Sequence, residues 1–549
     1  MNETSRAANS RSYVLVCAVT AALAGFLFGF DTIVISGAEQ QIQSLWRLDG
    51  FMHGMCMSAA LWGTVLGAML GGWPTEWLGR RKTLLGIGIL YFVSAVASGL
   101  APDTYTFMIA RFIGGVGVGI ATVASPLYIS EISPPHLRGR LAGMFQFNIV
   151  FGILIAFVSN YFIGRYVQQA IAWRWMLGVE AFPALLYTLL CFRIPESPRW
   201  LIVHGGQRQA GAEVFRKINP DFSAAQIDAL VDSVSESVGD RATAAKFWTA
   251  RLKIPILLAI LIAAFNQLSG INAVLYFAPR LLGLAGVPDP LSASIGIGIT
   301  NLIFTFVGLW LIDRLGRRTL LYIGSVGYIA SLAVCAFFFL TYPAFRAVST
   351  AIEVETAARQ MLQMDEPDAL LSEADQQTIQ QTYDQARLSL VAATSREAYS
   401  GTAVQFPDDA DPQETLAIAT AAKQQASSIL GFRKFVILFS IMAFIAAHAV
   451  GQGAVIWVFI SEIFPNRNRA AGQALGSVTH WLFAATITLV FPLAISTFDA
   501  GVLFAFFCAM MCLQLAWVKL MVPETKGIPL EEIQRQVGIP RGILRTNKE

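Results

Sequence analysis

Twelve apolar runs of roughly twenty residues dominate this 549-residue chain. An α-helix rises 1.5 Å per residue, so about twenty apolar residues cross the hydrocarbon core of a bilayer. The runs lie at approximately 13–37, 55–74, 84–101, 105–128, 140–163, 173–193, 254–280, 291–312, 319–341, 434–460, 469–495 and 499–521. With 55% hydrophobic residues, 14% charged residues and a mean hydropathy of +0.57, the chain is too apolar for a soluble protein. The sequence therefore predicts an all-α membrane protein with twelve transmembrane helices.

Basic residues are unevenly distributed between the loops. If the N-terminus is cytoplasmic, the loops on that side contain Arg80-Arg81-Lys82, Arg138 with Arg140, Arg314 with Arg317-Arg318, and Arg467 with Arg469. The short loops on the other side contain single arginines or none. Because Lys and Arg are enriched in cytoplasmic loops, we expect both termini to be cytoplasmic in a multi-pass protein of the cell inner (plasma) membrane. A net charge of +3 gives no indication of a nucleic-acid partner.

Three motifs occur twice in the chain. Glu76-Trp-Leu-Gly79-Arg80-Arg81 recurs as Asp313-Arg-Leu-Gly316-Arg317-Arg318, at an offset of 237 residues between the glycines. The Glu-Ile-x-Pro segment at 131–134 recurs at 462–465, and the Pro-Glu pair at 195–196 recurs at 523–524, at offsets of 331 and 328. The repeats predict two six-helix, pseudo-symmetric bundles of the same topology, with extra residues inserted in the second.

The expected domains follow from this layout: an N-terminal bundle at 1–193, a cytoplasmic helical linker at 194–253, a C-terminal bundle at 254–341 and 431–521, an insertion at 342–430, and a cytoplasmic tail at 522–549. The insertion, on the periplasmic side between spans nine and ten, contains 13 acidic and 5 basic residues. A small helical cap, with helices near 350–364 and 370–395, and a largely disordered loop are both open. In the linker, apolar periodicity predicts amphipathic helices near 207–217 and 224–238.

The repeated motifs place acidic and basic residues together at the cytoplasmic ends of the spans. We interpret them as an inner gate whose ion pairs break when the two halves rock apart. Alternatively, the basic residues only anchor loops on the cytoplasmic side. The acidic members are Glu76, Glu131, Asp313 and Glu462, and the basic members are Arg80, Arg138, Arg317 and Arg469.

Three charged residues fall inside the predicted spans of the N-terminal half: Asp31, Arg111 and Glu180. A charge inside a membrane is costly, and Arg111 needs a carboxylate partner that either acid can supply. An arginine beside a carboxylate favours its ionised form, and withdrawal of the arginine favours protonation. This alternation predicts proton coupling, whereas a permanent structural ion pair is the alternative.

The polar residues inside the C-terminal half are mostly uncharged. Gln267 and Asn272 lie near the middle of span seven, and an amide both donates and accepts, which suits a neutral, polyhydroxylated ligand. Indoles pack on the apolar face of a pyranose. Asn301, Gln146, Trp457, His480 and Trp481 extend this set. Any one of them can instead hydrogen-bond a neighbouring helix.

The sequence contains no arrangement that indicates an enzyme. The six cysteines lie in apolar runs without CxxC pairs or metal-ligand spacing, and no segment places a nucleophile beside a base. We therefore expect a secondary transporter with no cofactor and no metal.

The motifs together resemble those of the sugar porter family of the major facilitator superfamily. The resemblance rests on Gly29-Phe30-Asp31, the two Gly-Arg-Arg loops, Pro195-Glu196-Ser197-Pro198-Arg199, Gln267-Leu-Ser-Gly-Ile-Asn272 and Pro523-Glu524-Thr525-Lys526. It covers essentially the whole chain except 342–430. It implies the major facilitator fold, a sugar site at the membrane midplane, and alternating access.

The resemblance also implies roles for individual residues. Asp31, Arg111 and Glu180 match positions of the proton-coupled bacterial xylose symporters, whereas facilitative glucose transporters of animals have a neutral residue at the first position. Gln146, Gln267, Asn272, Asn301 and Trp457 match sugar-binding positions, Phe28 matches a pocket-lining position, and Tyr276 matches a position that helps close the outer side. Three residues depart from the pattern: Asn266 replaces a glutamine, His480 replaces an amide, and Ala454 replaces a proline.

We therefore expect proton-coupled symport of a neutral monosaccharide, hexose or pentose, by a monomer in the lipid bilayer. A facilitative uniporter of the same fold is the alternative, and a transporter-like sugar sensor is a remote one. The sequence does not identify the sugar.

Overall fold

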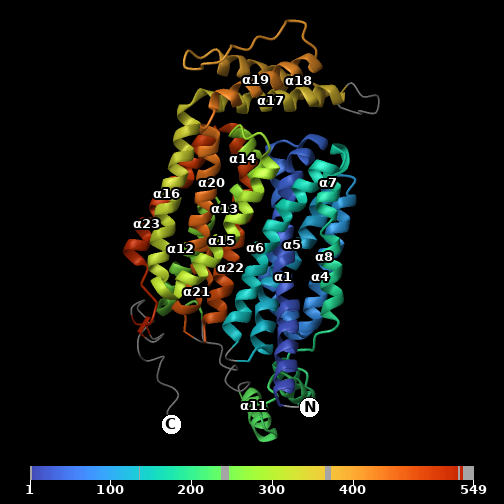
Figure 1. The fold of residues 1–549 in the computed structure, drawn as a ribbon, viewed down its shortest axis with the longest axis vertical. Coiled ribbons are helices and arrows are strands. Elements are labelled where there is room, and N and C mark those ends of the chain that lie inside the picture. The colour runs from blue at the N-terminus through green and yellow to red at the C-terminus, as the bar shows by residue number, and fades with distance from the viewer. Residues whose placement is uncertain are drawn as a thin grey trace.

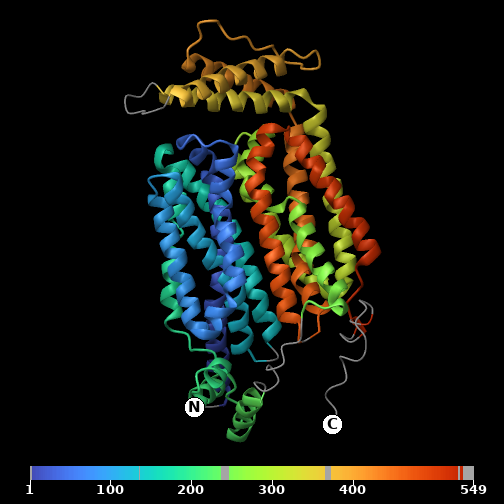
Figure 2. The same ribbon diagram turned by 180° about the vertical axis from the view of Figure 1, so that it is seen from behind.

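The computed structural model describes residues 3–134, 137–236, 247–364, 373–465 and 467–528, together with 532, 533 and 535. Within these ranges the regular structure is helical, and two helical bundles stand side by side (Figures 1 and 2). Parts of the predicted linker (237–246), insertion (365–372) and tail (529–531, 534 and 536–549) lie outside the described residues.

The first bundle contains the first six spans. Its helices are α1 (Glu3–Leu45), α2 (Gly50–Leu70), α3 (Gly72–Trp77), α4 (Arg80–Leu100), α5 (Thr104–Ile132), α6 (Arg138–Tyr166), α7 (Gln169–Gly178) and α8 (Ala181–Cys191). Helix α1 packs along α6, and α2 packs along α5. The sixth span is broken between α7 and α8, directly at Glu180, so neither piece crosses a membrane by itself.

The second bundle repeats this plan with more breaks. Its helices are α12 (Lys253–Leu268), α13 (Ile271–Tyr276), α14 (Ala278–Leu284), α15 (Pro290–Leu315), α16 (Arg317–Thr341), α20 (Arg433–Val450), α21 (Gln452–Ile463), α22 (Arg469–Thr497) and α23 (Ala500–Met521). The seventh span is interrupted at Gly270, whose φ of +87° disfavours residues other than glycine. Eleven segments of the described chain are long and apolar enough to span a membrane, and α7 with α8 completes the predicted twelve. The prediction of an all-α, twelve-helix membrane fold is confirmed.

The bundles contact each other mainly along two helix pairs, α2 with α22 and α6 with α15, and less extensively where α1 meets α13 and α14. The first pair is especially close, because a Cβ added at Gly54 of α2 would lie 1.9 Å from the backbone oxygen of Leu489 on α22. A side chain at Gly54 would therefore force the two helices apart.

Additional helices lie at the two ends of the bundles (Figures 1 and 2). At one end, which we call the insertion end, lie α17 (Pro343–Met364), α18 (Glu373–Thr394) and α19 (Pro412–Leu430). These helices share a small apolar core of their own, and Arg346 of α17 contacts Asp499 before α23 at 3.3 Å. At the opposite end, which we call the linker end, lie α9 (Pro198–Val203), α10 (Arg208–Ile218) and α11 (Ala224–Glu236). The described part of the insertion is therefore a helical cap.

Candidate functional site

Asp31 and Arg111 form a buried ion pair in the core of the first bundle. Nη1 of Arg111 donates to the carboxylate of Asp31, and Nη2 donates to the backbone oxygen of Asp31 at 2.9 Å. The side chains are only 2% and 1% exposed, respectively. Because Arg111 contacts both the side chain and the backbone of Asp31, it also connects α5 to α1.

Glu180 completes this cluster from the break between α7 and α8. Its carboxylate is fully buried and interacts electrostatically with both Asp31 and Arg111. Four buried atoms here have no hydrogen-bond partner among the described residues: Glu180 Oε1, Arg111 Nε, Tyr91 OH and Ser94 Oγ. Buried polar atoms are normally paired, so hydrogen bonding in this cluster is incomplete among the described residues.

The amides of the seventh span form a connected chain of hydrogen bonds. Asn272 Nδ2 donates to Gln267 Oε1 at 2.8 Å, and Gln267 Nε2 donates to Asn266 Oδ1 at 2.9 Å. The same Gln267 nitrogen lies 3.2 Å from Nε2 of His480 on α22. Hence the structure brings together four of the predicted sugar-binding residues, including the two that depart from the family pattern.

Aromatic rings pack at the His480 end of this chain. The ring of His480 packs against Trp457 and Trp481, at centroid distances of 5.3 and 4.8 Å. Phe28 of α1 meets Trp481 edge to face at 5.5 Å, which places an aromatic contact across the two bundles. Aromatic surfaces beside amides suit a sugar, whose faces are apolar and whose edges are hydroxylated.

Tyr276 links the two clusters. It is 1% exposed at the end of α13 in the second bundle, and it interacts electrostatically with both Arg111 and Asp31 of the first. The two remaining predicted sugar-binding residues lie on the other pair of contacting helices, with half-buried Gln146 on α6 and buried Asn301 on α15.

At the linker end, the repeated motifs form matching contacts in the two bundles. Arg80 donates to Glu131 at 2.9 Å, and Arg317 donates to Glu462 at the same distance. Each pair lies within one bundle. Asp313 also contacts Arg317, at 3.3 Å. The other predicted gate residues are not brought into these pairs: Glu76 and Arg138 are exposed, and Arg469 is half-buried.

The Pro-Glu motifs have a structural role that the sequence did not suggest. Glu196 accepts hydrogen bonds from the backbone nitrogens of Arg80 and Arg81 at 2.8 and 3.1 Å. Glu524 accepts in the same way from Arg317 and Arg318 at 2.9 and 3.1 Å. Each glutamate therefore satisfies the free N–H groups at the start of the helix that begins with the two arginines.

Sequence reasoning missed a second buried charged cluster, at the insertion end. Glu39, fully buried on α1, accepts from Nε and Nη2 of Arg280 on α14, both at 3.0 Å. Nε2 of the buried His53 on α2 lies 3.2 Å from Glu39. All three residues lie just at or beyond the ends of the predicted spans, so their charges were attributed to loops. The sequence did contain a signal for this cluster: Glu39 lies two residues after the apolar run 13–37, and Arg280 ends the apolar run 254–280.

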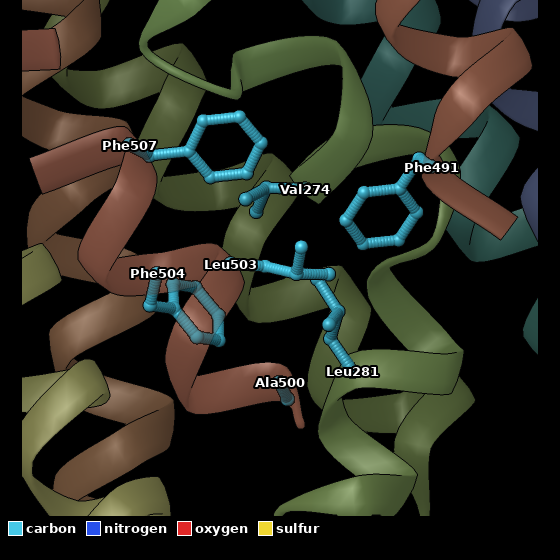
Figure 3. Close-up of a pocket in the computed structure, with 7 residues that line it drawn as sticks. All are labelled: Val274, Leu281, Phe491, Ala500, Leu503, Phe504 and Phe507. Atoms are coloured by element: carbon cyan, nitrogen blue, oxygen red, sulfur yellow. The ribbon is translucent and has the colours of Figure 1, made fainter. Parts of the chain in front are cut away.

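A small apolar cavity lies beside the broken seventh span, between α13, α14, α22 and α23 (Figure 3). It is lined by Val274, Leu281, Phe491, Ala500, Leu503, Phe504 and Phe507. Since none of these side chains is polar, the cavity offers a hydroxylated ligand no hydrogen bond.

Two six-helix bundles, with broken helices and polar clusters at their interface, define a secondary transporter of the major facilitator fold. A family model described as "Sugar (and other) transporter" matches residues 17–357 and 415–537, and the chain belongs to this family. It is therefore a multi-pass membrane protein and a transporter, not an enzyme.

Characterised relatives match along most of the chain. The D-xylose-proton symporter of Escherichia coli (strain K12) is 29% identical, and the alignment covers 95% of both proteins. Inositol transporter 4 of Arabidopsis thaliana is 30% identical over 98% of this chain and 94% of its own. The inward-open structure of the xylose transporter XylE from E. coli superposes with a TM-score of 0.68, at 28% identity, covering 95% of this chain and 99% of that one.

Proposed function

We propose that this protein imports a neutral monosaccharide, hexose or pentose, together with a proton by alternating access. The observation that carries the proposal is the Asp31–Arg111 ion pair, buried beside a second carboxylate, Glu180, whose Oε1 has no hydrogen-bond partner among the described residues. A purely structural ion pair does not need Glu180, because one arginine neutralises one carboxylate. Two carboxylates sharing one arginine retain one proton, and that proton can be exchanged.

The sugar is bound mainly by the second bundle. Gln267, Asn272 and His480 supply donors and acceptors, and the indoles of Trp457 and Trp481 supply apolar faces. Phe28 and Tyr276 then couple sugar binding in one bundle to the other bundle. Phe28 contacts Trp481 of the second bundle, and Tyr276 interacts electrostatically with Arg111 and Asp31 of the first. A ligand shifts a conformational equilibrium only if it binds the two states differently, and these bridging side chains provide such a difference.

We assign the linker end to the cytoplasm and the insertion end to the outside of the plasma membrane. The distribution of Lys and Arg supports this orientation, which places both termini in the cytoplasm. We propose a monomer as the working unit.

Uptake of a panel of labelled sugars, including D-xylose, D-glucose and L-arabinose, tests the proposal. Accumulation above the external concentration should occur for at least one sugar and should disappear on addition of a protonophore. Equilibration unaffected by the protonophore would instead establish a uniporter.

A further inference from the structure

The cluster of Glu39, His53 and Arg280 joins the two bundles at the insertion end and shares no residue with the Asp31 cluster or with the proposed sugar site. Glu39 and His53 belong to α1 and α2 of the first bundle, whereas Arg280 belongs to α14 of the second. Arg280 donates from Nε and Nη2 to the two carboxylate oxygens of Glu39, and Nη2 also donates to Gln43. A bidentate pair of this kind is strong and directional.

The pair lies where the bundles are in contact. Next to it, α2 and α22 approach each other so closely that Gly54 lies against the backbone of Leu489 and Gly50 against Leu493. The ring of Phe277, which precedes α14, packs on His53 at 6.1 Å and on Phe491 of α22 at 4.8 Å. For the insertion end to open, these surfaces must separate, and Arg280 must leave Glu39.

When the two bundles separate, Glu39 loses Arg280 as its counter-ion, and His53 is placed to replace it. Glu39 is fully buried, and a buried carboxylate that loses its only cation is strongly disfavoured. His53 is on the same bundle as Glu39, so it stays beside the carboxylate when Arg280 moves away. In the closed arrangement Nε2 of His53 already lies 3.2 Å from the Glu39 carboxylate, and Nδ1 has no hydrogen-bond partner within the described residues. A protonated His53 then neutralises Glu39 in place of Arg280.

Within the part of the chain that the structure describes, the other charged groups near this cluster have partners of their own. Arg280 and His53 are the charged groups that act on Glu39. In the turn between α1 and α2, Arg47 donates to the backbone oxygen of Gln363, and Asp49 accepts from the backbone of Met52. On α22, the backbone of Leu489 and Leu493 lies against Gly54 and Gly50, and Phe491 packs on Phe277. Asp289, after α14, accepts a hydrogen bond from the backbone of Ser292 at the start of α15.

We propose that Glu39 and Arg280 are a latch that holds the insertion end closed, and that His53 replaces Arg280 as the counter-ion when the latch opens. The proposal rests on the alternating access of the proposed function, but it concerns neither Asp31 nor the sugar-binding residues. Two consequences follow. Removing either charge of the latch favours the open state, and acid favours the open state only when His53 is present.

Hydrogen–deuterium exchange of the full chain in nanodiscs tests the latch without any sugar. In Glu39→Gln and Arg280→Gln, backbone amides of α14 and of the first turns of α2 should exchange at least about tenfold faster, the shift expected when a charge-assisted hydrogen bond is lost. Glu355→Gln is the matched control, since Glu355 pairs with Lys423 at the same end but within the cap. Its α14 exchange should equal that of the native chain. Native protection of α14 in both Glu39→Gln and Arg280→Gln would overturn the latch.

The same measurement at pH 7.5 and 5.5, corrected for intrinsic exchange, tests His53. The native chain should lose protection of α14 at pH 5.5, and His53→Gln should keep it. Equal loss in both would overturn the role of His53. Because neither experiment uses sugar or a proton gradient, a failure of the latch leaves the symport proposal standing, and a failure of symport leaves the latch standing.

Discussion

Arg111 holds Asp31 by two hydrogen bonds, one to the carboxylate and one to the backbone oxygen of the same residue. Both residues belong to the first bundle, so rocking of the bundles does not by itself separate them. Coupling therefore needs a residue of the second bundle that acts on the pair, and Tyr276 is placed to do so. This arrangement determines the following predictions.

Removal of the Tyr276 hydroxyl should weaken coupling more than sugar binding. In Tyr276→Phe the ring still fills its buried site, but the hydroxyl group that interacts electrostatically with Arg111 and Asp31 is lost. We expect fewer protons to enter per sugar, with the half-saturating sugar concentration in counterflow changed less than about threefold. The ratio is measured in proteoliposomes from parallel pH and label traces. An unchanged ratio of protons to sugar would show that the Tyr276 hydroxyl has no part in coupling.

Glu180→Gln should make active uptake require a lower external pH. With Glu180 absent as a second carboxylate, Arg111 remains with Asp31 and opposes its protonation. Counterflow, which needs no net proton movement, should persist. Uptake is measured from pH 5 to 8, and a profile identical to that of the native chain would exclude Glu180 from the proton site.

Gln267→Ala should weaken sugar binding without abolishing coupling. Gln267 is the centre of the chain that joins Asn266, Asn272 and His480, and each lost hydrogen bond costs about 1 kcal/mol, or roughly fivefold in affinity. We expect the half-saturating sugar concentration to rise at least about tenfold. Gln514→Ala is a suitable control, because Gln514 is buried in the same bundle on α23. A tenfold rise of the half-saturating sugar concentration in Gln514→Ala but not in Gln267→Ala would refute the assignment of Gln267 to the sugar site.

The Glu196 contact should make the stability of the linker end depend on pH. Burial raises the pKa of the Glu196 carboxyl, and hydrogen bonds from the backbone of Ser197, Arg81 and Arg80 lower it. Because the net shift is upward, the folded state holds this proton more tightly than the unfolded state, and the resulting stabilisation is lost as pH rises through the folded pKa.

The apparent Tm of Glu196→Gln, relative to that of the native chain, should therefore be higher at pH 7.5 than at pH 4.5. Since the chain is large, the expected difference in apparent Tm is of order 1 °C. Thermal unfolding in detergent at the two pH values measures it. A difference of the opposite sign would show that the backbone hydrogen bonds outweigh burial.

The fold was predictable because its signals are local and repeated. Runs of twenty apolar residues define the spans, and recurrence of Gly79-Arg80-Arg81 as Gly316-Arg317-Arg318 reveals the two halves. Likewise, Asp31 and Arg111 stand out because charges are rare inside apolar runs. The family model and the relatives then agree with the predicted class of transporter.

Contacts between distant residues were less predictable. The sequence placed Glu76 and Glu131 together among the acidic partners of the Gly-Arg-Arg arginines; Arg80 contacts Glu131, whereas Glu76 is exposed. The equivalent acid of the second bundle, Asp313, does contact Arg317, so position in the motif alone does not determine this contact. The Glu39–Arg280 pair was missed because residues 241 apart meet only through the packing of two bundles.

Sugar-dependent proton movement in Asp31→Asn tests the central claim most directly. The native chain in de-energised cells should alkalinise the medium when a transported sugar is added, because each sugar enters with a proton. Asp31→Asn should show no alkalinisation and no uphill accumulation while sugar counterflow continues. Asp228→Asn, which changes an exposed acid of α11 at the linker end, should behave like the native chain. Alkalinisation by Asp31→Asn equal to that of the native chain would contradict the account.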